Sequence, residues 1–427
     1  MKLLIKNAHV IDPANNIADF RDILVENSRI SRVAKSISNG ADKVIDATGK
    51  IVIPALVDMH VHLREPGRED KETIASGTRA ALKGGIGTVL AMPNTVPAID
   101  SVENVRLLKS IIKETAETHV AIAAAITVGR LGKELTAIPQ FRKEGVVAIT
   151  DDGSSVESAE LLYKAMRKAR ESRLLVICHC EDKALAAGGV MNLGPESTRL
   201  GLRGISGESE YKRVQRDVDL AAKAKCPVHV AHVSCAESVE IIAKAKKKGV
   251  KVTCETAPHY FVLTDEALGE YDTSKKMNPP LRGRKDVEAI KDGLARGTID
   301  AIASDHAPHT ISEKDIEFDR AEFGVIGLET ELAVSITMLV HGGVLDWTGL
   351  VQKLAVNPAK ILGLDRGTLS AGKEADLVII DPNKEWVVRT EDLVSKSKNS
   401  AFLNAALKGS VDYTVFGGKV VYKANDK

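Results

Sequence analysis

Six side chains that can bind a metal ion follow the ends of five predicted strands. They are His60 and His62 in VDMHVHLREPG, Asp152 in AITDDG, His179 in LLVICHCED, His232 in PVHVAHVS and Asp305 in IDAIASDHAPH. Imidazole and carboxylate groups suit zinc, and a site that leaves room for water can activate that water for hydrolysis. Because active sites form at the carboxyl ends of barrel strands, we expect the six to meet. The pattern predicts a metal-dependent hydrolase.

The strands that must position these ligands alternate with helical stretches between residues 54 and 364. The strand candidates are ALVDMHVH, GTVLAMP, HVAIAAAI, VVAIT, RLLVICH, PVHVAHV, KVTCET and DAIASD. The segments between them are long enough for helices, as in SVENVRLLKSIIKETAE. Eight βα units are the number in a closed barrel, so we predict an α/β fold with a (β/α)8 TIM-type barrel over 54–364.

Both ends of the chain are rich in short strands. KLLIKNAHVID, DILVENSRISRVA and KVIDATGKIVI precede the barrel, and GTLSAGKEADLVIIDPNKEWVV and YTVFGGKVVYK follow it. Turn residues separate these runs, as expected for antiparallel strands. We therefore predict one small composite β-sandwich domain, built from residues 1–53 and 365–427, beside the barrel.

The alternation of side chains along a strand predicts which of them point into the barrel. In ALVDMHVHL the apolar face with Val57, Met59 and Val61 is expected to meet the helices. Because neighbouring residues point to opposite faces, His60 and His62 should then lie inside.

The same alternation separates ligands from their neighbours on other strands. In VVAITDD it favours Asp152 over Asp151, because the bulky residues form the other face. In DAIASD it puts Asp305 on the inner face with two alanines. It also places His229 on the face of the strand opposite to that of His232, so we expect His229 to face the helices and to be hydrogen-bonded.

Composition excludes several classes of function. Lys+Arg 59 against Asp+Glu 58 gives a net charge of +1, so no basic field predicts nucleic-acid binding. MKLLIKNAHVIDP becomes polar too soon for a signal peptide, and no apolar run is long enough for a membrane span. Five cysteines, an odd number, suit a reducing cytoplasm. A Cys-His-Cys zinc site at Cys178–Cys180 is conceivable, but we favour packing because the two cysteines face away from His179.

The order of the motifs resembles the amidohydrolase superfamily and, within it, the bacterial type I dihydroorotases. HLREPG, MPNT, TDDG, HCED, AHVS, MNPPLR, SDHAPH and FGVIGLET occur in that family's order, and GTLSAGKEADLVIID matches its return to the terminal sheet. Hydantoinases use a carboxylated lysine at the fourth strand, where this chain has Asp152. The resemblance runs nearly end to end.

This resemblance implies an activity and a metal site. The activity is the zinc-dependent, reversible cyclisation of N-carbamoyl-L-aspartate to (S)-dihydroorotate, a step of de novo pyrimidine (UMP) synthesis. The implied ligands of one or two zinc ions, two being favoured, are His60, His62, Asp152, His179, His232 and Asp305. Asp152 would bridge the ions, and Asp305 would serve as general base and acid.

The resemblance also implies the substrate contacts, which are His62, Arg64, Asn94, Asn278, His309, Phe323 and Gly324. Arg64 and Asn94 would bind the carboxylate, since guanidinium groups suit it. For Arg64 the alternative is an ion pair with Glu65 or Glu69. The acidic segment 310–323 is expected to form a mobile lid, with an ordinary exposed connection as the alternative.

Three other functions share part of this pattern. An allantoinase or hydantoinase would share the metal chemistry, and a deaminase of the superfamily would need a base-specific pocket that no motif indicates. A dihydroorotase-like scaffold for aspartate transcarbamoylase would be expected to lack metal ligands. For the favoured function we expect a cytoplasmic enzyme with a small-molecule substrate and no nucleic-acid or membrane partner. It would form a homodimer and could form a complex with aspartate transcarbamoylase.

Overall fold

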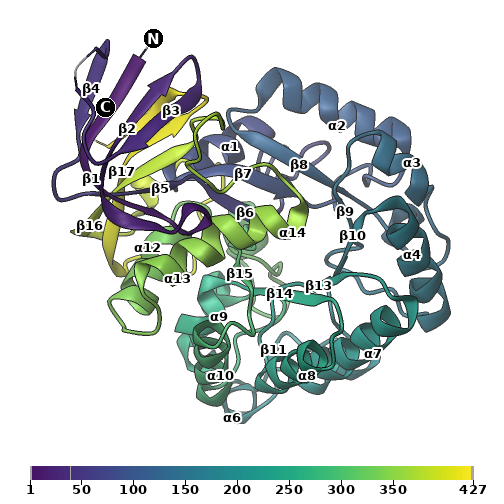
Figure 1. Ribbon diagram of the computed structural model, residues 1–427. Coiled ribbons are helices and arrows are strands. Elements are labelled where there is room, and N and C mark those ends of the chain that lie inside the picture. Colours follow the sequence, from purple (N-terminus) through teal and green to yellow (C-terminus); the bar gives the residue numbers. More distant parts are fainter. Residues whose placement is uncertain (1, 39, 425–427) are drawn as a thin grey trace.

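Eight short parallel strands form the centre of the computed structural model, which describes residues 2–38 and 40–424 (Figure 1). They are β6 (Leu56–Val61), β7 (Ile86–Ala91), β8 (His119–Ala124), β9 (Ala148–Ile149), β10 (Leu175–Cys178), β13 (Val228–Val230), β14 (Val252–Thr256) and β15 (Ala301–Ile302). They pair in chain order from β6 to β15. The backbone of His62 reaches that of His306 beyond β15, with N–H to O at 2.9 Å, and so links the last strand to the first. The predicted barrel is confirmed.

Helices surround this ring (Figure 1). They include α1 (Ile74–Lys83), α2 (Val102–Thr115), α3 (Ile138–Lys143), α4 (Ala159–Ser172), α7 (Glu208–Ala224), α8 (Ala236–Lys247), α10 (Arg284–Ala295) and α14 (Asn357–Leu362). Shorter elements in the connections are α5 (Lys183–Ala186), β11 (Met191–Asn192), α6 (Pro195–Leu200), β12 (Gly204–Ile205), α9 (Pro258–Val262), α11 (Ile311–Lys314), α12 (Glu331–Ser335) and α13 (Trp347–Val351). Ser101 and Ser158 cap α2 and α4 by accepting backbone N–H bonds, which fixes where these helices begin. Among the described residues, no helix is long and apolar enough to cross a membrane.

The barrel interior is lined mainly by small and flexible side chains, and it corrects one prediction. Val57 and Met59 belong to a buried cluster with Ala148, Ala301 and Ala303, residues of other strands that can meet only inside the ring. Val61, by contrast, packs in the larger cluster between strands and helices. The predicted outward direction of Val57 and Met59 is therefore wrong. The reason is a register shift in β6 between Asp58 and Val61, since a bulge inverts the alternation of side chains.

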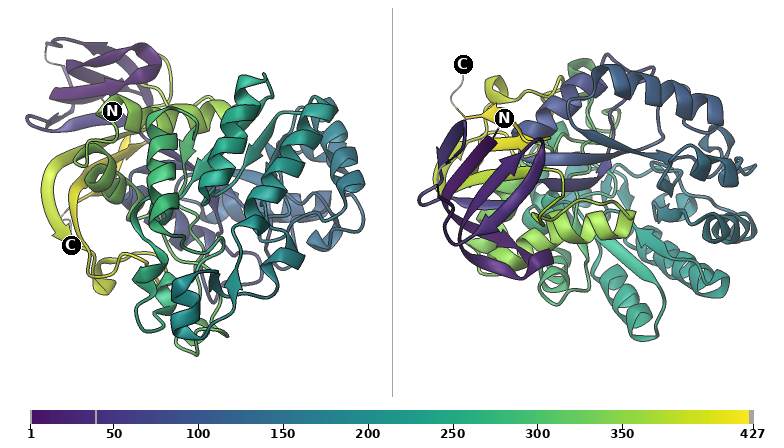
Figure 2. Two further views of the ribbon diagram at one scale, coloured as in Figure 1. Left: turned by 90° about the horizontal axis from the view of Figure 1, so that it is seen from below. Right: turned by 45° about the horizontal axis from the view of Figure 1, so that its top comes forward.

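The two ends of the chain form one further sheet beside the barrel (Figure 2). Its strands are β1 (Lys2–Asp12), β2 (Ile17–Glu26), β3 (Arg29–Ala34), β4 (Lys43–Asp46), β5 (Ile51–Pro54), β16 (Leu377–Val387), β17 (Ala406–Phe416) and β18 (Lys419–Lys423). β5 joins the ends, because it pairs with both β1 and β16. The predicted β domain from both termini is thus present. Its boundaries at 1–53 and 365–427 stay a prediction, and they include residues 1, 39 and 425–427, which lie outside the described ones.

Three residues beyond the strand ends have left-handed backbone conformations. The φ angles are +64° at Arg64, +36° at His232 and +49° at Asp305. Such angles are uncommon for residues other than glycine and cost roughly 1–2 kcal/mol each. They turn the chain just beyond β6, β13 and β15, so that consecutive side chains no longer alternate between the two faces. These turns direct functional side chains toward the carboxyl-terminal mouth of the barrel.

Candidate metal centre and substrate cavity

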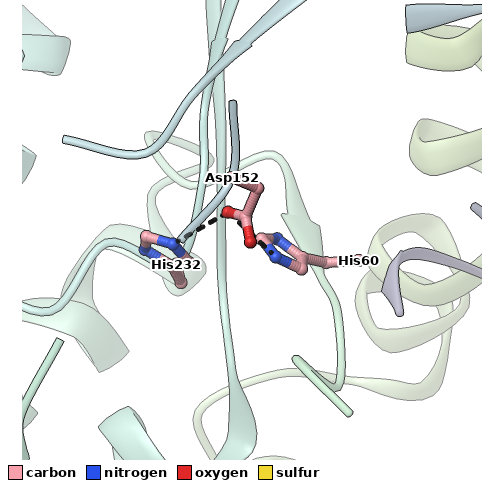
Figure 3. Close-up of side chains that lie close together, drawn as sticks. All are labelled: His60, Asp152 and His232. Atoms are coloured by element: carbon pink, nitrogen blue, oxygen red, sulfur yellow. Dashed lines mark ion pairs between the residues drawn. The ribbon is translucent and has the colours of Figure 1, made fainter. Parts of the chain in front are cut away.

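The six predicted ligands come together at the carboxyl ends of the strands. All are buried: His60, His62, Asp152, His179, His232 and Asp305. Asp152 lies at their centre, and Figure 3 shows its carboxylate between His60 and His232. Asp152 Oδ1 is 3.3 Å from His60 Nε2 and 3.6 Å from both His179 Nδ1 and His232 Nε2. Its Oδ2 is 3.4 Å from His62 Nε2.

Two overlapping groups of three have ligand atoms close enough to share a metal ion. One group contains His60, Asp152 and His232, and the other contains His60, His62 and Asp305. Two buried atoms, His60 Nε2 and Asp152 Oδ1, have no hydrogen-bond partner in the described chain. Buried polar atoms without a partner are costly, and a shared cation would satisfy both. The donor set therefore fits a divalent metal ion.

The carboxylates of this centre are held in the ionised form. Burial alone would raise the pKa of Asp152, but the surrounding imidazoles outweigh it and hold the pKa well below its usual range. Burial likewise opposes ionisation of Asp305, but the neighbouring imidazoles of His62, His60 and His232 lower its pKa to about 2. Asp305 Oδ1 is 3.4 Å from His62 Nε2. An ionised Asp305 beside the ligands can accept a proton at neutral pH.

A buried Glu255 sets the orientation of the His60 ring. Glu255 Oε1 accepts a hydrogen bond of 2.7 Å from His60 Nδ1, which leaves Nε2 to face Asp152. Its Oε2 accepts from His229 Nε2 at 3.1 Å, and His229 Nδ1 contacts Thr253 Oγ1 at 2.8 Å. His229 therefore lies inside the barrel behind His60. The prediction that His229 faces the helices is wrong, although it is hydrogen-bonded as expected.

His62 is oriented in a comparable way by Asn94. Asn94 Oδ1 accepts a 2.7 Å hydrogen bond from His62 Nδ1, so His62 Nε2 points toward Asp152 and Asp305. The amide nitrogen of Asn94 is then left to donate into the neighbouring cavity. Asp151, which the alternation of side chains excluded, accepts bonds from the backbone of Ile126 and Thr127 and takes no part in the ligand groups.

A cavity of about 360 Å³ opens above the ligands. Every predicted substrate contact lines it: His62, Arg64, Asn94, Asn278, His309, Phe323 and Gly324. Asp152, His179, His232 and Asp305 line it as well, so the cavity reaches the candidate metal centre. Arg68, Lys71 and Arg130 are lining residues that the sequence did not indicate. Arg68 and Lys71 follow HLREPG in the loop after β6, whereas Arg130 lies in a loop with no recognisable motif.

Arg64 faces the cavity without a carboxylate partner. Its Nε donates to the carbonyl oxygen of Pro308 at 3.1 Å. Burial lowers the pKa of Arg64 to about 10, although Asp305 and Glu313 oppose this, and a guanidinium with that pKa is still charged at neutral pH. Among the described residues, neither Glu65 nor Glu69 forms an ion pair with it, which excludes that alternative in this conformation.

His309 holds the turn that closes one side of the cavity. Its Nε2 donates to the carbonyl oxygen of Phe323 at 2.8 Å, so its Nδ1 accepts from Lys71 Nζ at 3.0 Å. Burial and the charges of Arg64 and Lys71 lower the pKa of His309 to about 2, which keeps the ring neutral. His306 is outside the ligand groups; its Nε2 is 3.3 Å from Glu72 Oε2, and its Nδ1 accepts from Gly327 N.

The predicted lid, 310–323, is packed against the cavity rim. Glu313 forms ion pairs of 2.7 Å with Arg68 and 2.9 Å with Lys71. Lys314 is buried and donates to the carbonyl oxygens of Glu322 and Gly324. The segment is thus anchored at both ends in this conformation, although about half of its residues are exposed. Its mobility stays a prediction.

Comparison with known proteins identifies similar chains over the full length. A family profile described as Dihydro-orotase-like matches residues 49–238, and one described as Amidohydrolase family matches 329–422. A protein of Elusimicrobium minutum named dihydroorotase is 51% identical over 98% of this chain and 97% of its own. A protein of Geotalea daltonii with the same name is 51% identical over 99% of this chain and 100% of its own. The solved L-hydantoinase (dihydropyrimidinase) of Arthrobacter aurescens has a TM-score of 0.90 at 25% identity, over 99% of this chain and 96% of that one.

Glu255→Gln tests the orientation of His60. The amide cannot accept from both imidazoles with the strength of a carboxylate, so affinity for a divalent metal ion is expected to fall roughly 10- to 100-fold. Chelator competition measures that affinity directly. Glu237→Gln, at a surface ion pair with Lys285, is the matched control and should leave it unchanged. Equal affinities in the two variants would contradict a positioning role for Glu255.

Proposed function

Since this chain belongs to the dihydroorotase family of the amidohydrolases, we propose that it interconverts N-carbamoyl-L-aspartate and (S)-dihydroorotate. It is a cyclic amide hydrolase by family, and this reaction is a step of pyrimidine synthesis. The observation that carries the proposal is the cavity in which an uncompensated Arg64 and the candidate metal centre face the same space. A cyclic amide that bears a carboxylate needs both features.

The alternatives are less well supported. The relatives near 50% identity carry the name dihydroorotase, whereas the solved hydantoinase is 25% identical. Asp152 also stands where hydantoinases were expected to have a modified lysine. The scaffold function has no support from the site, because all six expected ligands are present and buried together.

We propose zinc as the metal, with one or two ions per chain and two favoured. His60 and His62 would hold one ion, His179 and His232 the other, and Asp152 would contact both. When bound, such ions supply Lewis-acid activation of water and of the amide carbonyl. The fit rests on the unpartnered His60 Nε2 and Asp152 Oδ1 and on the preference of zinc for imidazole and carboxylate.

Asp305 is proposed to move the proton. During ring opening it takes the proton from the attacking water and delivers it to the ring nitrogen as the amide bond breaks. In ring closure it accepts the proton that this nitrogen loses. Its low pKa keeps it ready to accept, and its position at the rim of the ligand cluster lets it reach the cavity.

The remaining lining residues are proposed to orient the substrate. Arg64 and Asn94 bind the carboxylate that does not react. Asn278 and His309 contact the ring, and the backbone of Phe323 and Gly324 closes over it. We also propose a cytoplasmic homodimer and a possible complex with aspartate transcarbamoylase, which rest on the family resemblance alone.

The proposal is tested by assaying the purified chain with dihydroorotate, hydantoin and allantoin. Dihydroorotate should be the best substrate, and metal analysis of the same sample should find one or two zinc ions per chain. Because the ligands are all required, chelation should remove activity and added zinc should restore it. Preferred turnover of hydantoin or allantoin would overturn the assignment. Turnover that appears only after aspartate transcarbamoylase is added would support the proposed complex.

Asp305→Asn separates proton transfer from metal binding. The amide keeps the shape and one oxygen donor but has no basic carboxylate. The variant is expected to retain most of its zinc and to lose roughly two or more decades of kcat in both directions. Zinc content and kcat must be measured on one preparation. A variant that keeps its metal and turns over near the wild-type rate would show that Asp305 is only a ligand.

Arg64→Met tests the carboxylate contact. Methionine keeps much of the side-chain length but leaves the buried substrate carboxylate without its charged partner. We expect a loss of several kcal/mol in kcat/KM for dihydroorotate, which corresponds to about two decades or more. Arg106→Gln, at an exposed ion pair with Glu144, provides the control. An unchanged kcat/KM in Arg64→Met would mean that the carboxylate is held elsewhere.

A further inference from the structure

Four cationic side chains line the substrate cavity. Two of them form ion pairs with carboxylates, and two form none with the described residues. Arg68 is paired with Asp70 and Glu313, and Lys71 is paired with Glu313. Arg64 and Arg130 have no carboxylate oxygen within 4.0 Å among the residues that the structure describes. Arg64 is buried and Arg130 is half-buried, and a guanidinium withdrawn from water without a counter-ion is costly. Both groups are therefore available to a ligand that brings negative charge.

Arg130 reaches the cavity from the loop that follows β8. One of its terminal nitrogens, Nη2, donates to the backbone oxygen of Asp152. Its Nε is buried and has no hydrogen-bond partner in the described chain. A guanidinium has five N–H groups, and the bond to Asp152 uses only one of them. Within the part of the chain that the structure describes, the remaining donors form no hydrogen bond, although the side chain lines the cavity.

The loop that carries Arg130 is fixed by its own hydrogen bonds. Asp151 Oδ1 accepts from the backbone nitrogens of Ile126 and Thr127 at 2.8 and 3.0 Å. Asp100 Oδ2 accepts from Gly129 N at 2.7 Å. Within this frame Arg130 itself has a φ of +58°, which is unfavourable for a residue with a side chain. The frame therefore holds the arginine in one direction at some cost in backbone energy.

Gly153 leaves space between Arg130 and Asn94. A Cβ atom at Gly153 would lie 3.2 Å from Arg130 Nη2 and 3.9 Å from Asn94 Nδ2. The two donors therefore flank one small volume at the wall of the cavity. Asn94 Oδ1 is occupied by His62, so its Nδ2 is the atom that can donate there. A guanidinium and an amide N–H that flank one volume suit a carboxylate.

We propose that Arg130 is a further substrate-binding residue, which holds the non-reacting carboxylate of the substrate together with Asn94 Nδ2. This inference rests on the proposed function, because that carboxylate is the part of dihydroorotate that a neutral cyclic amide lacks. It is ionised in both the open and the closed substrate, so the contact operates in both directions of the reaction. Arg130 thereby contributes to selection of carboxylated over neutral cyclic amides.

The competing explanation is that Arg130 only stabilises the chain at Asp152 through its bond to the backbone oxygen. The two explanations predict different effects of replacing Arg130 on KM, kcat and zinc content. Loss of a carboxylate contact raises KM for dihydroorotate and leaves the metal centre intact. Loss of support for Asp152 lowers zinc content or kcat, because Asp152 lies at the centre of the ligands.

The experiment compares wild type with Arg130→Met, Arg130→Lys and Leu131→Ala, all loaded with zinc. Leu131 is the next residue in the same loop and is 68% exposed, so its variant is the matched control. Arg130→Met is expected to raise KM for dihydroorotate by about tenfold to a hundredfold, the usual effect of losing a hydrogen bond to a charged group. Its kcat and zinc content should stay close to wild type, Arg130→Lys should recover part of the loss, and Leu131→Ala should change KM little.

Several results would overturn the inference. They are an unchanged KM in Arg130→Met, an equal rise in Leu131→Ala, or a loss of zinc or kcat that accounts for the defect. The wild-type assay separates this from the proposed function. If wild type turns over dihydroorotate and Arg130→Met does so equally well, only the role of Arg130 fails. If wild type prefers neutral cyclic amides, the proposed function fails, and Arg130 with it.

Discussion

An ionised carboxylate that is only 3% exposed, as Asp152 is, has lost most of its hydration and requires partners that replace it. Four imidazoles from three strand ends supply nitrogen atoms within 3.3–3.6 Å of its oxygens. No single helix or strand could present all of these groups to one point. A closed parallel barrel can, because the carboxyl ends of its strands converge on one mouth. The charge at the centre thus depends on the whole barrel, and the sheet formed by the chain termini lies beside that barrel and not at its mouth.

The cluster of candidate ligands is supported by groups outside it. Glu255 and Asn94 each engage the Nδ1 atom of a histidine, which leaves both Nε2 atoms directed at the same pair of carboxylates. Such contacts restrict the rings to one orientation before any ion binds, so less ordering remains to be done on binding. The left-handed backbone conformations of His232 and Asp305 add a local free-energy cost of roughly 1–2 kcal/mol each. The packed core beneath them offsets this, since its strands have buried, mostly apolar or small side chains.

The sequence predicted the regular parts of this arrangement because their patterns are local. Eight apolar runs separated by helical segments became eight strands, and histidines or aspartates at their ends became the buried cluster. The prediction failed where the backbone departs from regular alternation. A register shift in β6 turns Met59 inward, and His229 shares the barrel interior with His232 because the left-handed turn at His232 changes the alternation. The sequence did not indicate Arg130, because its direction depends on hydrogen bonds that the loop backbone donates to Asp151 and Asp100, and no local pattern contains these bonds.

The charges of the cavity would favour an anionic ligand more strongly once the metal centre is filled. The carboxylates of Asp152 and Asp305 oppose the positive charge of Arg64, and that of Asp152 also opposes the positive charge of Arg130. Divalent ions at the histidines would neutralise those carboxylates and leave the guanidiniums as an uncompensated positive charge at the rim. Attraction between unlike charges is strong where water is partly excluded, so the field that orients a carboxylated substrate would arise together with the metal centre. Metal binding and substrate selection would then be coupled, because ions that offset the two carboxylates would strengthen the attraction of Arg64 and Arg130 for an anionic ligand.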